Sequence, residues 1–218
     1  MNIDFDRARH VMVEQQVRPW EVIDPLVLDA FENIRREDFV PPRLRKLAFA
    51  DVALPLEHGE HMLRPVVEGR MLQGLELAPE NEVLEIGTGS GYLTACLAHI
   101  VRAVTSIDLH EDFVARARSR LETLGFACAK VQCADAFAFR PGSRFDAVLV
   151  GGAVAEVPSA WREWVRVGGR MVVVRGLSPV QECVVLTRLT EDTWREESLF
   201  ETDLPYLRGG EPRPRFVF

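Results

Sequence analysis

The 218-residue chain lacks several features that would direct it to a membrane or to an oxidising compartment. No stretch approaches the ~20 apolar residues that a spanning helix needs, and the start (MNIDFDR) has no basic segment followed by an apolar core. The four cysteines include no C-x-x-C pair, so we expect reduced core residues at Cys96, Cys128, Cys133 and Cys183. These absences favour a cytoplasmic protein with no membrane partner.

The sequence also gives no support for a metal site or for nucleic-acid binding. His58 and His61 form an H-x-x-H pair in an expected loop, but no cysteine and no helical H-E-x-x-H context accompanies them, so no metal site is expected. The chain has 33 acidic and 26 basic residues, a net charge of -7, which argues against broad affinity for nucleic acid. We therefore expect neither a metal nor a nucleic-acid partner.

The most informative segment that is present is a glycine-rich turn, EIGTGSGY, at residues 85–92. Val83, Leu84 and Ile86 are typical of a buried strand and residues 92–100 of a helix, so the glycines fall on a strand-to-helix turn. There the backbone can approach a ligand, and the start of the helix leaves N–H groups free. An ordinary turn could contain the same glycines, but the flanking elements favour a nucleotide-like ligand. The expected ligand-binding residues are Glu85, Gly87, Thr88, Gly89, Ser90, Gly91 and Tyr92.

The spacing of this turn selects among nucleotides. A dinucleotide fingerprint would place glycine where Tyr92 stands. A second expected strand, residues 103–107, ends in Asp108, whose carboxylate can accept hydrogen bonds from both hydroxyls of a ribose. Glu85 is unfavourable beside a phosphate but suits a ligand with an ammonium and a sulfonium group. S-adenosyl-L-methionine therefore fits better than NAD.

The alternation of elements predicts an α/β fold of the Rossmann-like methyltransferase type. We expect a doubly wound, mostly parallel seven-stranded sheet, with helices alternating with strands as βαβαβαβαβ before a C-terminal antiparallel hairpin. Asp24 and Pro25 indicate the start of an N-terminal helix, and Gly125 indicates a helix end. A single domain is expected over 1–218, with an N-terminal helical region and substrate loop (1–78), a cofactor-binding core (79–176) and a C-terminal hairpin and tail (177–218).

In such a sheet the ligand lies beyond the carboxyl ends of the strands. This adds Leu109, Asp135 and Ala136 to the expected cofactor site. Asp135 can accept a hydrogen bond from an adenine amino group or cap the turn that follows it, and both interpretations have equal weight. The segment Val150-Gly151-Gly152-Ala153 leaves room for a substrate and is not the N/D-P-P-aromatic segment of nucleic-acid amino-methylating enzymes.

Several segments together resemble the protein-L-isoaspartate O-methyltransferase family over nearly the whole chain. They are MVEQQVR (12–18), DPLVLDAF (24–31), REDFVP (36–41), the stretch 83–92, FDAVLV (145–150) with Pro158, SLF (198–200) and LPYL (204–207). The glycine motif is shared by many methyltransferases, whereas the N-terminal block and the C-terminal segments are specific to this family.

The resemblance implies methylation of the α-carboxylate of isoaspartate with S-adenosyl-L-methionine as donor, and a damaged protein or peptide as partner. The family's substrate loop typically reads G-x-G-Q-T-I-S-Q-P, its serine being the active-site hydroxyl, whereas residues 57–65 here read EHGEHMLRP. With Gly59 and Pro65 in register, Glu60 replaces glutamine, His61 replaces threonine and Leu63 replaces serine. The candidate catalytic residues in this loop are His61, Leu63 and Arg64.

Three functions remain open at this point. A carboxylate with a pKa near ~4 is already ionised at neutral pH, so methyl transfer to it needs positioning and no general base. The chain can therefore be an isoaspartyl-type methyltransferase with altered acceptor specificity, or a cofactor-binding protein without repair activity. It can also be a methyltransferase for a small-molecule acceptor, with His61 as base. The sequence does not indicate an oligomeric state.

Overall fold

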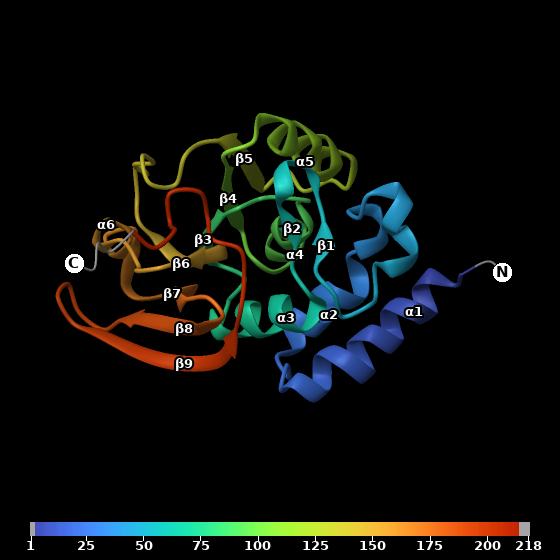
Figure 1. Cartoon of the computed structure of the whole chain (residues 1–218), viewed down its shortest axis with the longest axis horizontal. Helices are drawn as coiled ribbons and strands as arrows, with labels where there is room; N and C mark the ends of the chain where they lie inside the picture. The colour runs from blue at the N-terminus through green and yellow to red at the C-terminus, as the bar shows by residue number, and fades with distance from the viewer. Residues whose placement is uncertain (1–2, 214–218) are drawn as a thin grey trace, which may run out of the picture.

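A seven-stranded sheet forms the centre of the molecule in the computed structural model, which describes residues 3–213 (Figure 1). The strands lie in the order β5-β4-β3-β6-β7-β8-β9. Their bounds are β3 (Glu82–Ile86), β4 (Ala103–Asp108), β5 (Ala129–Cys133), β6 (Phe145–Val154), β7 (Val165–Leu177), β8 (Val180–Arg188) and β9 (Trp194–Thr202). Neighbours from β5 through β7 are parallel, whereas β8 and β9 are antiparallel additions. The expected mostly parallel sheet with a C-terminal hairpin is confirmed.

Helices precede the sheet in the chain and connect its parallel strands. They are α1 (Phe5–Met12), α2 (Pro25–Asn33), α3 (Pro65–Gly74), α4 (Tyr92–Ile100), α5 (Glu111–Thr123) and α6 (Ser159–Arg162). A small two-stranded sheet, β1 (Leu54–Pro55) with β2 (His61–Met62), lies between α2 and α3 in the sequence. Among residues 3–213, no helix has the length and apolar character to cross a bilayer.

The helix boundaries follow the capping residues in the sequence. Asp24 is the N-cap of α2, where its side chain accepts a hydrogen bond of 2.8 Å from the backbone N–H of Leu26, and Pro25 occupies the first helical position. Gly125 follows the end of α5 with φ +80°, a backbone angle that glycine adopts without strain. Both predicted boundaries are confirmed.

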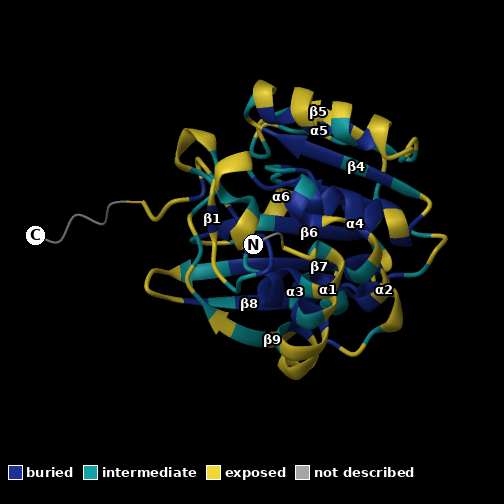
Figure 2. Ribbon diagram, turned by 90° about the vertical axis from the view of Figure 1, so that its right-hand side faces the viewer, coloured by how far each residue is buried: buried dark blue, intermediate teal, exposed yellow. Residues whose placement is uncertain are grey.

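The sheet buries both of its faces, which divides the apolar core in two. Along β6, Leu149 belongs to one cluster of buried side chains, whereas Val148 and Val150 belong to the other. The first cluster includes the N-terminal helices and α4, which is almost wholly buried, while α5 keeps one exposed face (Figure 2). The second is completed by Trp161 and Trp164, whose rings stack 5.6 Å apart.

The expected helix between the third and fourth parallel strands is wrong. Residues 134–144 form turns instead, in which Asp135 accepts backbone hydrogen bonds from Ala138 and Phe139. Pro141 and Gly142 follow directly and interrupt any longer helix. The chain therefore reaches β6 through a short irregular connection.

The cysteines also differ in part from expectation. Cys96 and Cys183 are buried thiols, as expected, but Cys128 is half-buried and Cys133 is exposed. Cys133 ends β5, which is the edge strand of the sheet and buries only Val131. An edge strand has neighbours on one side only, so its apolar pattern does not guarantee burial.

The topology places a ligand site at the carboxyl end of β3. The chain runs from β3 to β4 on one side, and β6 lies on the other side of β3, so the strand order reverses there. The connections leaving β3, β4 and β6 separate at this point and leave a crevice in open α/β sheets.

Candidate cofactor and acceptor site

The backbone of the glycine turn after β3 adopts positive φ angles, which are unfavourable for residues with a side chain. Gly87, Gly89 and Gly91 have φ angles of +92°, +51° and +84°. The N–H groups of Gly87 and Thr88 donate to the carbonyl of Ile107 at 2.8 and 3.3 Å, which ties the turn to the end of β4. The three glycines are therefore required by the turn itself, and Gly87 and Gly89 leave the wall of the adjoining cavity free of side chains.

Asp108 connects this turn to the segment that follows β4. Its Oδ2 accepts a hydrogen bond of 2.8 Å from the N–H of Gly89, and its Oδ1 accepts one of 2.9 Å from the N–H of His110. Burial raises the pKa of Asp108, while these two N–H groups act in the opposite direction. A carboxylate offers about four lone-pair positions, so two remain for hydroxyl groups of a ligand.

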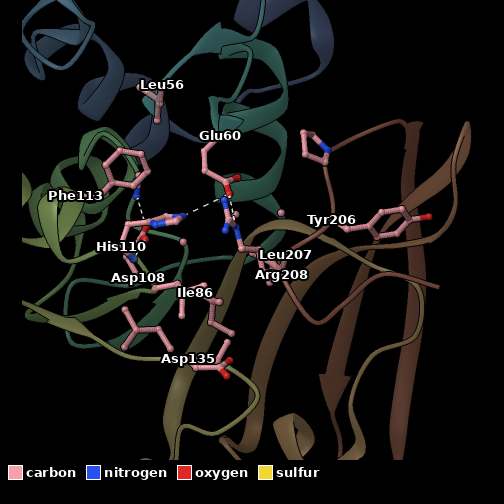
Figure 3. Close-up of a pocket in the computed structure, with 18 of the residues that line it drawn as sticks. Leu56, Glu60, Ile86, Asp108, His110, Phe113, Asp135, Tyr206, Leu207 and Arg208 are labelled. Carbon is pink, nitrogen blue, oxygen red and sulfur yellow. Dashed lines mark hydrogen bonds and ion pairs between the residues drawn. The ribbon is translucent and has the colours of Figure 1, made fainter. Parts of the chain in front are cut away.

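A cavity of about 100 Å³ lies directly above these residues (Figure 3). Of the expected cofactor residues, its lining includes Gly87, Gly89, Asp108, Leu109, Asp135 and Ala136. Gly151 and Gly152, at the end of β6, form part of the same wall. The structure thus brings together residues from the ends of four strands, β3, β4, β5 and β6, that are far apart in the sequence.

Thr88 and Ser90 face a second, smaller space. A cavity of about 30 Å³ lies between the glycine turn and the substrate loop, where Thr88 and Ser90 oppose His61 and Leu63. The hydroxyl of Thr88 also lies 2.6 Å from that of Ser106, which anchors it beneath the turn.

Glu85, Gly91 and Tyr92 line neither of these two cavities. Glu85 is fully buried beneath the turn, where its Oε2 accepts hydrogen bonds of 2.5 Å from the hydroxyls of Thr94 and Ser106. Burial raises the pKa of Glu85 to about 7. Its position indicates support of the turn, and direct contact with a ligand stays a prediction.

Tyr92 packs into the helical core. Its ring lies 4.6 Å from the guanidinium of Arg36 and makes an edge contact with Phe39 at 5.6 Å between ring centroids. Gly91 approaches the Cβ of Ala117 in α5, where an added Cβ would lie only 3.1 Å away. Both residues therefore fix the start of α4 against its neighbours.

Asp135 caps a turn and also lines the cavity, so its position is compatible with both roles considered for it from the sequence. Its Oδ1 accepts a hydrogen bond of 2.9 Å from the N–H of Phe137, so it caps the turn. It also lines the cavity, and its carboxylate retains acceptor capacity there. An adenine contact remains compatible with the cap.

The substrate loop, residues 57–65, closes the opposite side. Pairing of β1 with β2 holds the two ends of residues 56–60 together. Arg36, which is fully buried, donates to the carbonyl of Leu63 at 2.6 Å and pairs with Glu68. His61 and Leu63 line the cavity, but Arg64 does not, because its guanidinium pairs with Asp51 at 3.4 Å.

A C-terminal segment forms a wall that the sequence interpretation missed. Ala153 donates to the carbonyl of Pro205 at 2.9 Å and accepts from the N–H of Leu207 at 2.8 Å, so residues 205–207 pair with the end of β6. A Cβ on Gly152 would lie 2.8 Å from Leu207 Cδ2. The adjacent glycines at 151 and 152 were therefore a signal of close approach by another segment.

This wall brings Arg208 to the mouth of the cavity (Figure 3). Its Nε lies 3.4 Å from Glu60 Oε1, and its Nη2 donates to the carbonyl of His58 at 2.9 Å. Arg208 is the only arginine or lysine that lines this cavity within residues 3–213. It was absent from the sequence-based candidates because a lone arginine near the end of a chain carries no motif.

The H-x-x-H pair does not converge in the structure. His58 lies against His110, with ring centroids 4.0 Å apart, and its Nε2 is 2.8 Å from Asp112 Oδ1. His61 is exposed and lies on the cavity wall instead. The two histidines of the motif therefore take part in different contacts.

The lining residues fit S-adenosyl-L-methionine. The glycine turn leaves space that a Cβ would narrow, and Asp108 retains two acceptor positions suited to a ribose. Three carboxylates, those of Glu60, Asp108 and Asp135, line the cavity with one arginine. An acidic lining favours a sulfonium cation over a phosphate.

Comparisons with known proteins agree with this geometry. Residues 7–202 match the family model of protein-L-isoaspartate(D-aspartate) O-methyltransferase. The protein-L-isoaspartate O-methyltransferase of Petrotoga mobilis is 36% identical over 197 residues, which cover 89% of this chain and 92% of that protein. Protein-L-isoaspartate O-methyltransferase 2 of Marinobacter nauticus is 34% identical over 213 residues, 97% of each chain.

Solved structures share the fold. A protein from Plasmodium falciparum, described as a putative protein-L-isoaspartate O-methyltransferase in complex with S-adenosyl-L-homocysteine, superposes with a TM-score of 0.80 at 17% identity. The superposition covers 94% of this chain and 99% of that one. With the match to the family model and the relatives above, the chain belongs to the protein-L-isoaspartate(D-aspartate) O-methyltransferase family and is an S-adenosyl-L-methionine-dependent methyltransferase.

Proposed function

We propose that this protein methylates the α-carboxylate of isoaspartyl residues in damaged proteins or peptides, and that Arg208 orients this carboxylate. The observation that carries the proposal is the position of Arg208, the single arginine on the cavity wall among residues 3–213. The family's named activity on isoaspartate supports the choice of acceptor.

The residues present can perform this reaction without a proton-transfer group. When bound, S-adenosyl-L-methionine supplies an electrophilic methyl group. An α-carboxylate has a pKa of about 3.5, so it enters the site ionised and attacks through an oxygen lone pair. What the protein must supply is alignment of the two reactants and exclusion of water. Leu63, which is 7% exposed, lines the acceptor side and provides an apolar surface there.

Leu63 has no polar group that could bind the acceptor carboxylate. Arg208 anchors this carboxylate instead. Its guanidinium can hold a carboxylate through two parallel N–H donors. Glu60 already lies 3.4 Å away, so the incoming carboxylate must displace Glu60 from Arg208. We therefore expect weaker acceptor binding than a free arginine would give, with an effect on KM in particular.

The test is steady-state kinetics with an isoaspartyl peptide, comparing the native chain with Arg208→Gln. Loss of one charge-assisted contact of about 1.5–3 kcal/mol corresponds to a rise in KM of roughly 10- to 150-fold. Arg144→Gln is the matched control, because Arg144 pairs with Glu191 on the surface and does not line the cavity. If Arg208→Gln and Arg144→Gln have the same KM as the native chain, Arg208 does not anchor the acceptor.

A native chain that binds S-adenosyl-L-homocysteine but does not methylate the peptide would exclude isoaspartate as acceptor. In that case His61→Ala, tested against small hydroxyl acceptors, examines the alternative of a small-molecule methyltransferase, since His61 also lines the cavity.

A further inference from the structure

Two imidazoles and a carboxylate cluster beside the mouth of the cofactor cavity. They belong to His58 in the substrate loop, to His110 just before α5, and to Asp112 in the first turn of α5. Their ligand atoms all lie within 4.8 Å of one another. Within residues 3–213, no other three histidine, cysteine or acidic side chains are grouped in this way.

The cluster is held in place by specific contacts. His58 Nε2 lies 2.8 Å from Asp112 Oδ1, and the two imidazole rings stack at 4.0 Å with an angle of 4° between their planes. Both rings contact the edge or face of Phe113, at 5.4 and 5.3 Å between centroids. The backbone of His58 is in the left-handed region, with φ 60°, and Arg208 binds its carbonyl. These contacts direct the imidazole of His58, in the substrate loop, at the start of α5.

A candidate fourth ligand, the carboxylate of Glu60, lies next to the cluster. Glu60 Oε1 is 3.6 Å from His110 Nε2, and Figure 3 shows the two side chains directed at each other. Two positive side chains compete for these acids: Arg116 pairs with Asp112 at 3.0 Å, and Arg208 pairs with Glu60 at 3.4 Å. A cation that binds here must displace these partners, so its affinity is lower than that of a closed structural zinc site.

The donor set suits a divalent transition-metal ion, and its spacing is close to what such an ion requires. Imidazole nitrogen and carboxylate oxygen bind zinc at about 2.0–2.1 Å, so two ligands at the tetrahedral angle lie about 3.3 Å apart. The separations in the cluster exceed this by at most about 1.5 Å, a difference that rotations about the side-chain bonds can remove. The side chains of His58 and Asp112 are 40% and 49% accessible, so they have room for such rotations when an ion replaces the hydrogen bond between them.

We propose that His58, His110 and Asp112 bind a zinc-like divalent ion, which ties the substrate loop to the start of α5. His110 follows Asp108 by two residues, and its N–H is bound by the Asp108 carboxylate. A bound ion therefore links the acceptor-side loop to the segment that holds the expected ribose ligand. The consequence is slower exchange of the cofactor. Metal binding at this cluster does not depend on the identity of the methyl acceptor.

The first test measures metal binding by the full chain after treatment with EDTA. Zn²⁺ is titrated by calorimetry, and Co²⁺ by its visible absorption. We expect one ion per chain, and at least tenfold weaker binding by His58→Ala and by Asp112→Asn. His99→Ala is the matched control, because His99 also pairs with an aspartate, Asp29, at 2.7 Å but lies outside the cluster. Equal affinity in His58→Ala, Asp112→Asn and His99→Ala would overturn the site.

The second test measures the release of S-adenosyl-L-homocysteine in the presence of Zn²⁺ or EDTA. We expect Zn²⁺ to slow release severalfold from the native chain and from His99→Ala, and to leave release from His58→Ala unchanged. If Zn²⁺ binds at the cluster and the release rate of the native chain stays the same, the ion does not restrain the loop. Neither readout uses an isoaspartyl acceptor, so failure here is distinguishable from failure of the proposed function.

Discussion

Replacing Asp108 with alanine tests how the cofactor is held. In the structure this carboxylate accepts hydrogen bonds from the N–H groups of Gly89 and His110 and retains two acceptor positions that face the cavity. Hydrogen bonds from ribose hydroxyls to a charged acceptor contribute about 1.5–3 kcal/mol each, part of which water replaces in the variant. We expect a net loss of about 2–3 kcal/mol, or a Kd for S-adenosyl-L-homocysteine that is roughly 30- to 150-fold higher.

The same substitution also removes the two backbone contacts, so stability must be measured beside affinity. Two lost hydrogen bonds of about 1 kcal/mol each lower the Tm by about 4–8 °C in a chain of this size. Ser106→Ala is the control, because it removes hydrogen bonds to Glu85 and Thr88 beneath the glycine turn without changing the cavity wall. We expect it to lower Tm but to change Kd by less than about threefold.

Titration calorimetry with S-adenosyl-L-homocysteine provides the comparison. A Kd for Asp108→Ala within about threefold of the native value, in a variant that remains folded, would refute the assignment of Asp108 to the cofactor. A loss of affinity in Ser106→Ala as large as that in Asp108→Ala would instead attribute the effect to the shape of the turn.

Three further variants test separate parts of the structure. Because the pKa of Glu85 is raised to about 7 in the fold, the unfolded state loses this proton first, so the free energy of unfolding should fall as pH rises from about 4.5 to 7. Glu85→Gln should remove roughly 3 kcal/mol of that fall, as measured by urea denaturation across this pH range; an unchanged pH dependence would contradict the assignment. Gly152→Ala should displace Leu207, lower stability by about 1–3 kcal/mol and weaken cofactor binding, whereas Gly142→Ala, with no neighbour within 4 Å, should do neither. Leu63→Ser should raise kcat/KM for an isoaspartyl peptide severalfold, at a cost in stability of about 2–4 kcal/mol; unchanged kcat/KM would show that the hydroxyl has no role here.

The sequence predicted the sheet, and it predicted several residues that line the cavity beside the glycine turn, because their signals are local. The glycine turn, the strand before it and Asp108 lie within one βαβ unit, in which spacing along the chain determines spacing in the fold. The capping residues of α2 and the glycine after α5 act over a few residues, and both boundaries are confirmed. The prediction of a helix between β5 and β6 was wrong because turn residues follow Asp135.

The acceptor half was less predictable because it depends on long-range contacts. Arg208 reaches Glu60 from a segment 148 residues further along the chain. His110 faces His58 only because the substrate loop folds back onto the start of α5. Arg64 was a reasonable candidate beside Leu63, but its pairing with Asp51 directs it elsewhere. None of these pairings follows from periodicity or from a motif, since each joins elements brought together by the packing of the whole sheet.

The most direct test of the account is methyl transfer by the native chain from labelled S-adenosyl-L-methionine to a peptide. The peptide contains isoaspartate, and a peptide of the same sequence with ordinary aspartate is the control. We expect one base-labile methyl ester per isoaspartyl residue and none on the control peptide. Binding of S-adenosyl-L-homocysteine with no label on the isoaspartyl peptide, or equal labelling of both peptides, would contradict the proposed function.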